Sequence, residues 1–168
     1  MKTAMAEQHF QAHINQVFDA YAQPDNYVRM VDLTRVAPIE ALSAEDDGTL
    51  AVLKVRFKFI APLSSAVTAV IDPDKITWVQ THTIDRASAT ERIAFQPDHY
   101  EKMLDFKGGH ARYEEVSPDR TRRTRQGPFG IKGIPFFVRG AVEGAIASGL
   151  EDYYAEEAGQ FQGFIAAG

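Results

Sequence analysis

Residues 133–146 read GIPFFVRGAVEGAI and open the longest stretch of helical periodicity in the chain. Apolar residues recur at helical spacing from here onward, which predicts a C-terminal helix over residues 134–165. On a helical wheel with about 100° per residue, the side chains expected to meet a sheet fall within an arc of about 80°. They are Val138, Val142, Ile146, Gly149, Tyr153 and Phe164.

Alternating residues upstream of this helix predict strands. Residues 53–59 read LKVRFKF, so one face of the strand is apolar and the other is basic and solvated. The turn sequence DDG at 46–48 joins this strand to residues 36–44 as a hairpin. Further strands are predicted over residues 3–11, 76–85, 89–97, 102–116 and 120–129, with a bulge at Gly108–Gly109.

Two short helices follow the first strand. Residues 13–23 have helical periodicity, and Pro24 stands at a favourable first helical position of the segment 24–33. Residues 63–72 favour one more helical segment.

Strands followed by a long helix indicate an α+β fold, in which a curved antiparallel sheet wraps around the C-terminal helix. The chain has 168 residues and no repeat or linker, so residues 1–168 are expected to form a single domain.

This order of elements resembles the helix-grip fold of the START and birch-pollen-allergen-like (SRPBCC, polyketide cyclase-like) superfamily over essentially the whole chain. Three pieces resemble a branch catalogued only as a domain of unknown function: VFDAYAQPDNYVRM (17–30), the aromatic strand around Trp78, and GIPFFVRGAVEGAI. The resemblance implies a deep apolar cavity between the sheet and the long helix. Relatives hold lipids, sterols, polyketides or other hydrophobic molecules there, and a minority catalyse cyclisation or hydration.

Composition narrows the function classes. A formal charge of −5 argues against a general affinity for polyanions, so no nucleic-acid partner is expected. The absence of cysteine excludes disulfides, thiolate metal sites and thiol nucleophiles. No apolar window reaches the length of a signal or membrane segment, so we expect a cytoplasmic protein without a transmembrane segment. The glycine motifs of nucleotide-binding sites are missing from the sequence, and no cofactor is expected.

Aromatic strand residues are the first candidates for ligand binding. Phe57 and Phe59 share the apolar face of one predicted strand, and Trp78 and His82 share a face of another. An aromatic concave surface suits an apolar ligand. The competing interpretation is core packing for the aromatic residues and a hydrogen-bonded structural role for His82.

Residues of the C-terminal helix complete the candidate site. Tyr153 and Gly149 fall inside the sheet-facing arc. Three polar residues at or near its edge could orient the polar group of a ligand: Arg139, Glu143 and Glu157. Alternatively, their long side chains follow the helix flank and carry their charges into water. Glu143 is the strongest of the three because it matches a recurring glutamate of the resembled motif.

The helix glycines need separate explanations, because glycine costs about 1 kcal/mol against alanine in a helix interior. Gly149 either leaves room for a ligand or lets a strand approach. Gly140 and Gly144 face away from the sheet and mark either a bend or a contact with another subunit, as in a homodimer.

Residues 120–125, RTRRTR, form the one dense basic run. It would suit phosphates, a lipid headgroup or nucleic acid, but the acidic segment 114–119 lies beside it. We therefore favour a solvated strand whose charges pair across a hairpin. The arginines concerned are Arg120, Arg122, Arg123 and Arg125. His9 and His13 lie on either side of a strand-to-helix junction, so no metal site is predicted.

The sequence leaves three function hypotheses open. The preferred one is a carrier or sensor that binds a small hydrophobic or amphipathic molecule, without catalysis. The second is a cyclase or hydratase that uses an inward acid or base, for which Glu143, Glu157 and His82 are the candidates. The third is an interaction module that contacts a protein or a nucleic acid through the basic strand or the glycine-marked helix face.

Overall fold

The computed structural model describes residues 2–168 and combines one antiparallel sheet with a long C-terminal helix. The strands are β1 (Lys2–Phe10), β2 (Val36–Asp46), β3 (Leu50–Phe59), β4 (Thr77–Asp85), β5 (Thr90–Pro97), β6 (Leu104–Phe106), β7 (Gly109–Ser117) and β8 (Arg120–Ile131). The helices are α1 (Ile14–Tyr21), α2 (Pro24–Arg29), α3 (Ser65–Thr68), the 3-10 turn η1 (Pro73–Lys75) and α4 (Phe136–Ala167).

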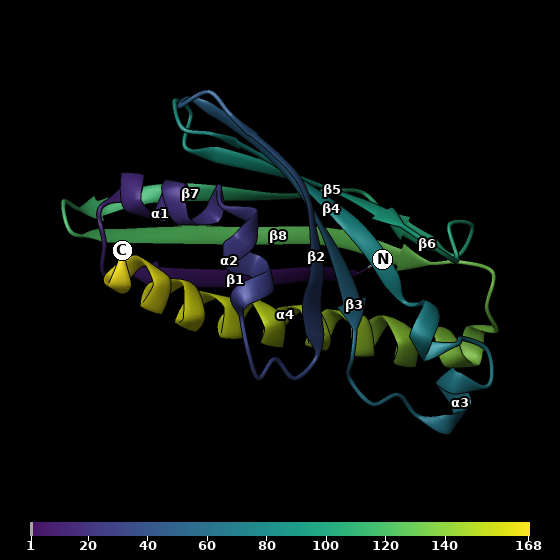
Figure 1. The fold of residues 1–168 in the computed structure, drawn as a ribbon. Coiled ribbons are helices and arrows are strands. Elements are labelled where there is room, and N and C mark those ends of the chain that lie inside the picture. Colours follow the sequence, from purple (N-terminus) through teal and green to yellow (C-terminus); the bar gives the residue numbers. More distant parts are fainter. Residues whose placement is uncertain (1) are drawn as a thin grey trace.

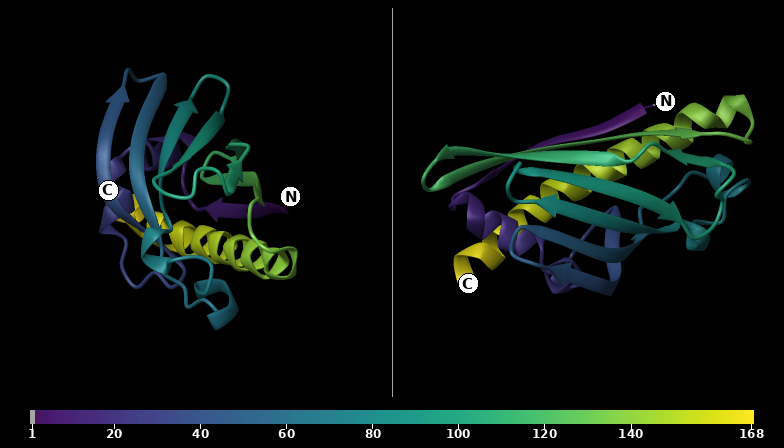
Figure 2. Two further views of the ribbon diagram at one scale, coloured as in Figure 1. Left: turned by 90° about the vertical axis from the view of Figure 1, so that its right-hand side faces the viewer. Right: turned by 90° about the horizontal axis from the view of Figure 1, so that it is seen from above.

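The sheet has the strand order β1-β8-β7-β5-β4-β3-β2, with β6 paired to β8 beyond the end of β7. It curves around α4, which runs diagonally across its inner face (Figures 1 and 2). The short helices α1 and α2 pack near the C-terminal end of α4, while α3 lies near its N-terminal end (Figure 1). The predicted α+β helix-grip architecture is confirmed. Within residues 2–168 there is no helix with the length and apolar character that crossing a bilayer requires.

Local sequence explains how the short helices begin. The His13 side chain accepts a hydrogen bond from the Asn15 N–H at 3.1 Å, and the Gln16 side chain accepts one from the His13 N–H at 3.0 Å. This reciprocal pair caps α1. Pro24 occupies the first turn of α2, where a missing N–H is harmless.

One predicted strand is divided in two. Residues 102–116 were expected to form one strand with a bulge, but β6 and β7 are separate strands that both pair with β8. The reason is Gly108, whose φ of +80° turns the chain between them. The helix expected over residues 63–72 is only the four residues of α3. The last strand runs two residues further than predicted, to Ile131.

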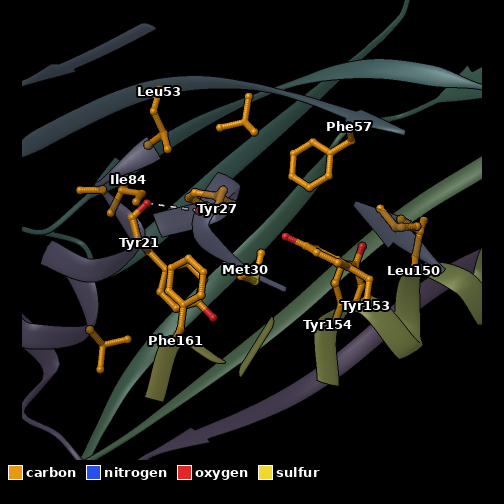
Figure 3. Packing of buried hydrophobic residues seen from close by; sticks show 14 of the residues in the cluster. Tyr21, Tyr27, Met30, Leu53, Phe57, Ile84, Leu150, Tyr153, Tyr154 and Phe161 are labelled. Carbon is orange, nitrogen blue, oxygen red and sulfur yellow. Dashed lines mark hydrogen bonds between the residues drawn. The ribbon is translucent and has the colours of Figure 1, made fainter. Parts of the chain in front are cut away.

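The core lies between the sheet and α4 and is rich in aromatic side chains (Figure 3). The rings of Tyr21 and Phe161 stack with centroids 4.3 Å apart, and Tyr27 meets Phe161 edge to face at 5.1 Å. The Tyr27 hydroxyl donates to the backbone carbonyl of Tyr21, the bond drawn as a dashed line in Figure 3. These contacts anchor α1 and α2 against the C-terminal half of α4.

Candidate functional site

Strand β4 presents three polar side chains to the interior. Trp78, Gln80 and His82 alternate with outward residues, so all three face α4, and each is at most 5% exposed. Opposite them, α4 contributes Tyr153 and Glu157, both fully buried. The sequence-based candidates Trp78, His82, Tyr153 and Glu157 therefore lie in one interior.

Two arginines of β8 also point inward, which the sequence analysis did not predict. Arg123 donates to Glu91 at 2.7 Å and to Glu157 at 3.4 Å, and Arg125 donates to Glu157 at 3.4 Å. All four side chains are at most 2% exposed. We call these two arginines and two glutamates, together with His82, the charged cluster. The signal that could have revealed it is strand alternation, because Arg123 and Arg125 share a face with the buried Phe129.

Only part of the basic run behaves as predicted. Arg122 lies on the outer face and pairs with Glu114 across the β7–β8 hairpin and with Glu7 of β1. Arg120 is exposed. The prediction of a solvated strand is wrong for Arg123 and Arg125, because buried carboxylates on other elements compensate their charges.

The charged cluster is electrically balanced, and its hydrogen bonds are shortest around Glu91. Glu91 accepts further bonds from His82 and Tyr113, each at 2.6 Å. The guanidinium of Arg123 also lies 4.1 Å from the ring centre of Tyr21, where a cation–π contact offsets part of its desolvation. Burial alone would raise the pKa of Glu91, but the charge of Arg123 and the bond from His82 outweigh it and hold that pKa far below 4.5.

His82 is held as a neutral, oriented imidazole. Burial lowers its pKa from 6.5, against the opposing effect of Glu91. With Nδ1–H donated to Glu91 and the ring neutral, Nε2 is left as an acceptor, and this atom has no partner within residues 2–168. A carboxylate that orients a histidine in this way is typical of general bases.

Several buried donors also lack partners. Among the described residues, Trp78 Nε1, Gln80 Nε2 and the hydroxyl of Tyr153 make no hydrogen bond. Two of them belong to residues that pack on Phe57, whose ring stacks on Trp78 at 5.9 Å and meets Tyr153 edge to face at 5.6 Å. Figure 3 shows the hydroxyl groups of Tyr153 and Tyr154 directed from α4 toward the sheet. Unpartnered buried donors are uncommon in native proteins and typically indicate a functional role or a missing partner.

An apolar cavity lies at the α3 end of α4. Its volume is about 20 Å³. The lining residues are Phe59, Leu63, Val67, Ile71, Ile76, Tyr100, Met103, Leu104, Ile131, Val142 and Ile146. Such a volume holds about one water molecule. The deep cavity implied by the resemblance is thus occupied largely by aromatic rings and by the charged cluster.

The remaining predicted site residues have different surroundings. Phe59 lines the cavity, and a Cβ added at Gly149 would lie 2.7 Å from its Cε2 atom, so Gly149 lets strand β3 approach α4. Glu143 is 9% exposed and accepts the backbone N–H of Ile131 at 3.2 Å, which ties the start of α4 to the end of β8. Arg139 is exposed and does not join the other candidates.

Metal-binding residues do not gather in the part of the chain that the structure describes. No group of three or more His, Asp or Glu side chains in residues 2–168 has the geometry to hold a metal ion. His9 pairs with Glu7 on the surface at 3.1 Å, and His13 caps α1.

Solved structures with the same fold include two enzymes. The chain is similar to the Zhui aromatase/cyclase from Streptomyces sp. R1128, with a TM-score of 0.62 and 13% identity over 95% of this chain and 93% of that one. It is also similar to a point mutant of norcoclaurine synthase from Thalictrum flavum in complex with a transition-state analogue. That match has a TM-score of 0.61 and 13% identity over 99% of this chain and 94% of the synthase.

No protein-family model matches the chain, and no curated protein matches it by sequence. The branch of unknown function therefore stays a prediction. The structural likenesses cover nearly the whole chain and show that it has the START-like helix-grip fold.

Proposed function

We propose that the chain binds a small, mostly apolar molecule bearing a hydrogen-bond acceptor between α4 and strands β3 and β4. The observation that carries this proposal is the pair of unpartnered N–H donors on β4, Trp78 Nε1 and Gln80 Nε2, with the buried Tyr153 hydroxyl on α4 opposite that strand. Trp78 Nε1 and Gln80 Nε2 can only donate, so a carbonyl or similar oxygen is their natural partner. Leaving such a donor unpaired in the interior costs about 1–3 kcal/mol, which a bound acceptor would recover.

The cavity and the donors lie at successive positions along β3 and along the segment that leads from η1 into β4. Phe59 and Ile76 line the cavity. The next inward pair along β3 and β4 is Phe57 and Trp78, which are direct neighbours in the sheet. An elongated ligand could therefore place its apolar body in the cavity and its acceptor among the donors.

Binding requires this end of the molecule to open, because about 20 Å³ is far below the 300–1,000 Å³ of typical ligand sites. The segment best suited to move is α3, a four-residue helix whose Val67 fits into the cavity wall. Short, locally bonded segments have the lowest local stability in a fold. We infer that α3 moves outward and Phe59 changes rotamer when the ligand enters.

The single tryptophan of the chain provides a direct test. Its indole N–H gives one assignable resonance in a ¹H–¹⁵N spectrum. Titration with 2-acetylnaphthalene should shift that resonance, and this ketone should bind about tenfold more tightly than 2-isopropenylnaphthalene, in which a CH₂ group replaces the acceptor oxygen. Tyr153→Phe should reduce this preference.

Tyr100→Phe is the matched control. Tyr100 lines the cavity, but its hydroxyl accepts the N–H of Asp72 and lies outside the donor group, so the affinities for the two naphthalenes should change together and their ratio should not. Equal affinity for the two naphthalenes, or an unmoved indole resonance at saturation, would contradict the proposed site.

A second candidate function is proton transfer by His82, favoured by its bond to Glu91 and its unpartnered Nε2. The base would remove a proton from a carbon next to a ligand carbonyl and return a proton from solvent. In D₂O, the methyl protons of bound 2-acetylnaphthalene should then exchange faster with the wild type than with His82→Asn. Exchange at the buffer rate in both would exclude this activity.

Cytoplasmic location, lipid as the ligand class, and a homodimer remain predictions from the sequence. The donors around Phe57 favour a ligand with a polar oxygen over a pure hydrocarbon. A simple measurement of molar mass by light scattering would test the homodimer.

A further inference from the structure

The outer face of the sheet carries a broad groove that is separate from the interior site. It has a volume of about 860 Å³ and lies over β1, β8, β7 and β5. Five outward-pointing polar side chains line its central part: Thr90, Arg92, His110, Arg112 and Thr124. A second hollow of about 430 Å³ adjoins it and shares Arg92 and His110. The two together form a continuous groove with a basic centre.

The arginines at that centre have no carboxylate partner. Within residues 2–168, Arg92 and Arg112 form no ion pair, whereas nearby Arg122 is paired with Glu114 and Glu7. Glu7, the acidic residue at the rim, is already engaged by Arg122 and His9. The centre of the groove therefore carries uncompensated positive charge on a chain whose net charge is −5.

The strand register holds these arginines side by side. Arg92 of β5 lies directly opposite His110 of β7, so Arg112 is its diagonal neighbour on the same face. Diagonal neighbours across a sheet have side chains about 7–8 Å apart at their bases, within reach of one small ligand. Thr90 and Thr124 flank Arg112 on the two adjoining strands and add hydroxyl donors.

We propose that this groove binds a small anion with at least two phosphate or carboxylate groups. Two guanidinium forks and neighbouring hydroxyls match the oxygens of such a ligand, because arginine binds both anions in a bidentate manner. The groove volume falls in the range of small-molecule sites. A single carboxylate would leave one of the two arginines unpaired.

The groove is independent of the proposed interior function. Glu91, Ala111 and Arg125 also border the groove, but their side chains point inward and are buried, while Arg92, Arg112 and Thr124 point outward and are exposed. Strand alternation thus places the two sites on opposite faces of the sheet. An anion in the groove could bind with the interior empty or filled.

Calorimetric titration of the full chain with pyrophosphate and with citrate at low salt tests the proposal, and the two arms distinguish phosphate from carboxylate ligands. At least one should bind with a dissociation constant below about 1 mM. Arg92→Gln and Arg112→Gln should each weaken that binding by about tenfold, and added NaCl should weaken it further. Acetate, with one charge, should not bind measurably.

Arg120→Gln is the matched control, since it removes one exposed positive charge at the hairpin end of β8, away from the groove. The Arg120→Gln variant should bind the anion with an affinity within twofold of the wild type. Both groove substitutions are at exposed positions, and an unchanged circular dichroism spectrum would verify folding. Absence of binding by both anions, or equal weakening by Arg120→Gln, would overturn the proposal. So would tighter, arginine-dependent binding of oligo-dT, which would identify the groove as a nucleic-acid surface.

Discussion

Arg123 and Glu91 form an ion pair of 2.7 Å in which neither side chain reaches solvent. The next residue, Arg122, forms its ion pair with Glu114 on the outer face, where both side chains are partly exposed. Adjacent arginines of one strand thus occupy opposite environments. The inner one is required for charge balance, because a buried carboxylate without its partner is strongly unfavourable.

Replacing Arg123 should therefore lower the free energy of unfolding far more than replacing Arg122. Arg123→Met leaves the Glu91 carboxylate buried without its strongest partner, and we expect the free energy of unfolding to fall by about 3–5 kcal/mol. Arg122→Met removes an exposed pair and should cost less than about 1 kcal/mol. Urea unfolding followed by circular dichroism measures both. Similar losses in the two variants would mean that the charged cluster does not need its charges balanced.

The charged cluster should also make stability depend on pH. Burial lowers the folded-state pKa of His82 below 6.5, so the unfolded chain binds a proton that the folded chain does not as the pH falls through 6.5. Arg123 and His82 hold the pKa of Glu91 below 4.5 in spite of its burial, and the stability this provides is lost as the pH falls below 4.5. The free energy of unfolding should then decrease in two stages on acidification.

Urea unfolding at a series of pH values from 8 to 2 tests this expectation, with His82→Asn as the diagnostic variant. The asparagine amide can still donate to Glu91 but does not titrate. The variant should lose the first stage and keep the second. A first stage that persists in the variant would assign it to another group.

Much of the fold could be predicted because it depends on local patterns. The alternation of residues 53–59 and the helical spacing predicted for residues 134–165 each reflect one buried face of β3 and of α4. The charged cluster could not be predicted in this way. Burial of Arg123 depends on Glu91 and Glu157, which lie 32 and 34 residues away in sequence on other elements. The acidic residues nearest to Arg123 in the sequence, in the segment 114–119, suggested an exposed hairpin instead.

Gly149 offers a direct test of packing between α4 and β3. Gly149→Ala places a Cβ about 2.7 Å from Cε2 of the buried Phe59, and overpacking of this kind costs about 1–3 kcal/mol. Better helix propensity recovers about 1 kcal/mol, so a net loss of about 1 kcal/mol is expected. Gly140→Ala, where the new Cβ meets nothing within 4 Å, should instead gain stability.

The same substitution in a Phe59→Leu background identifies the cause. The smaller side chain removes the ring atom that the new Cβ would meet, so Gly149→Ala should be neutral or stabilising there. Thermal unfolding of the four proteins completes a double-mutant cycle. A penalty of equal size in both backgrounds would show that Phe59 is not the contact that requires glycine.

Glu143 should act as a clamp between α4 and β8 through its bond to the backbone N–H of Ile131. Glu143→Ala leaves that buried N–H without an acceptor and should cost about 1–2 kcal/mol. Glu143→Gln keeps an acceptor oxygen and should cost less. Amide hydrogen exchange separates this role from a general loss of stability, because Ile131 should exchange much faster in the alanine variant while Phe129 and Arg123 change only with the global stability. If Glu143 instead served a ligand, the Ile131 amide would be unaffected and the loss would appear only in the titration with 2-acetylnaphthalene.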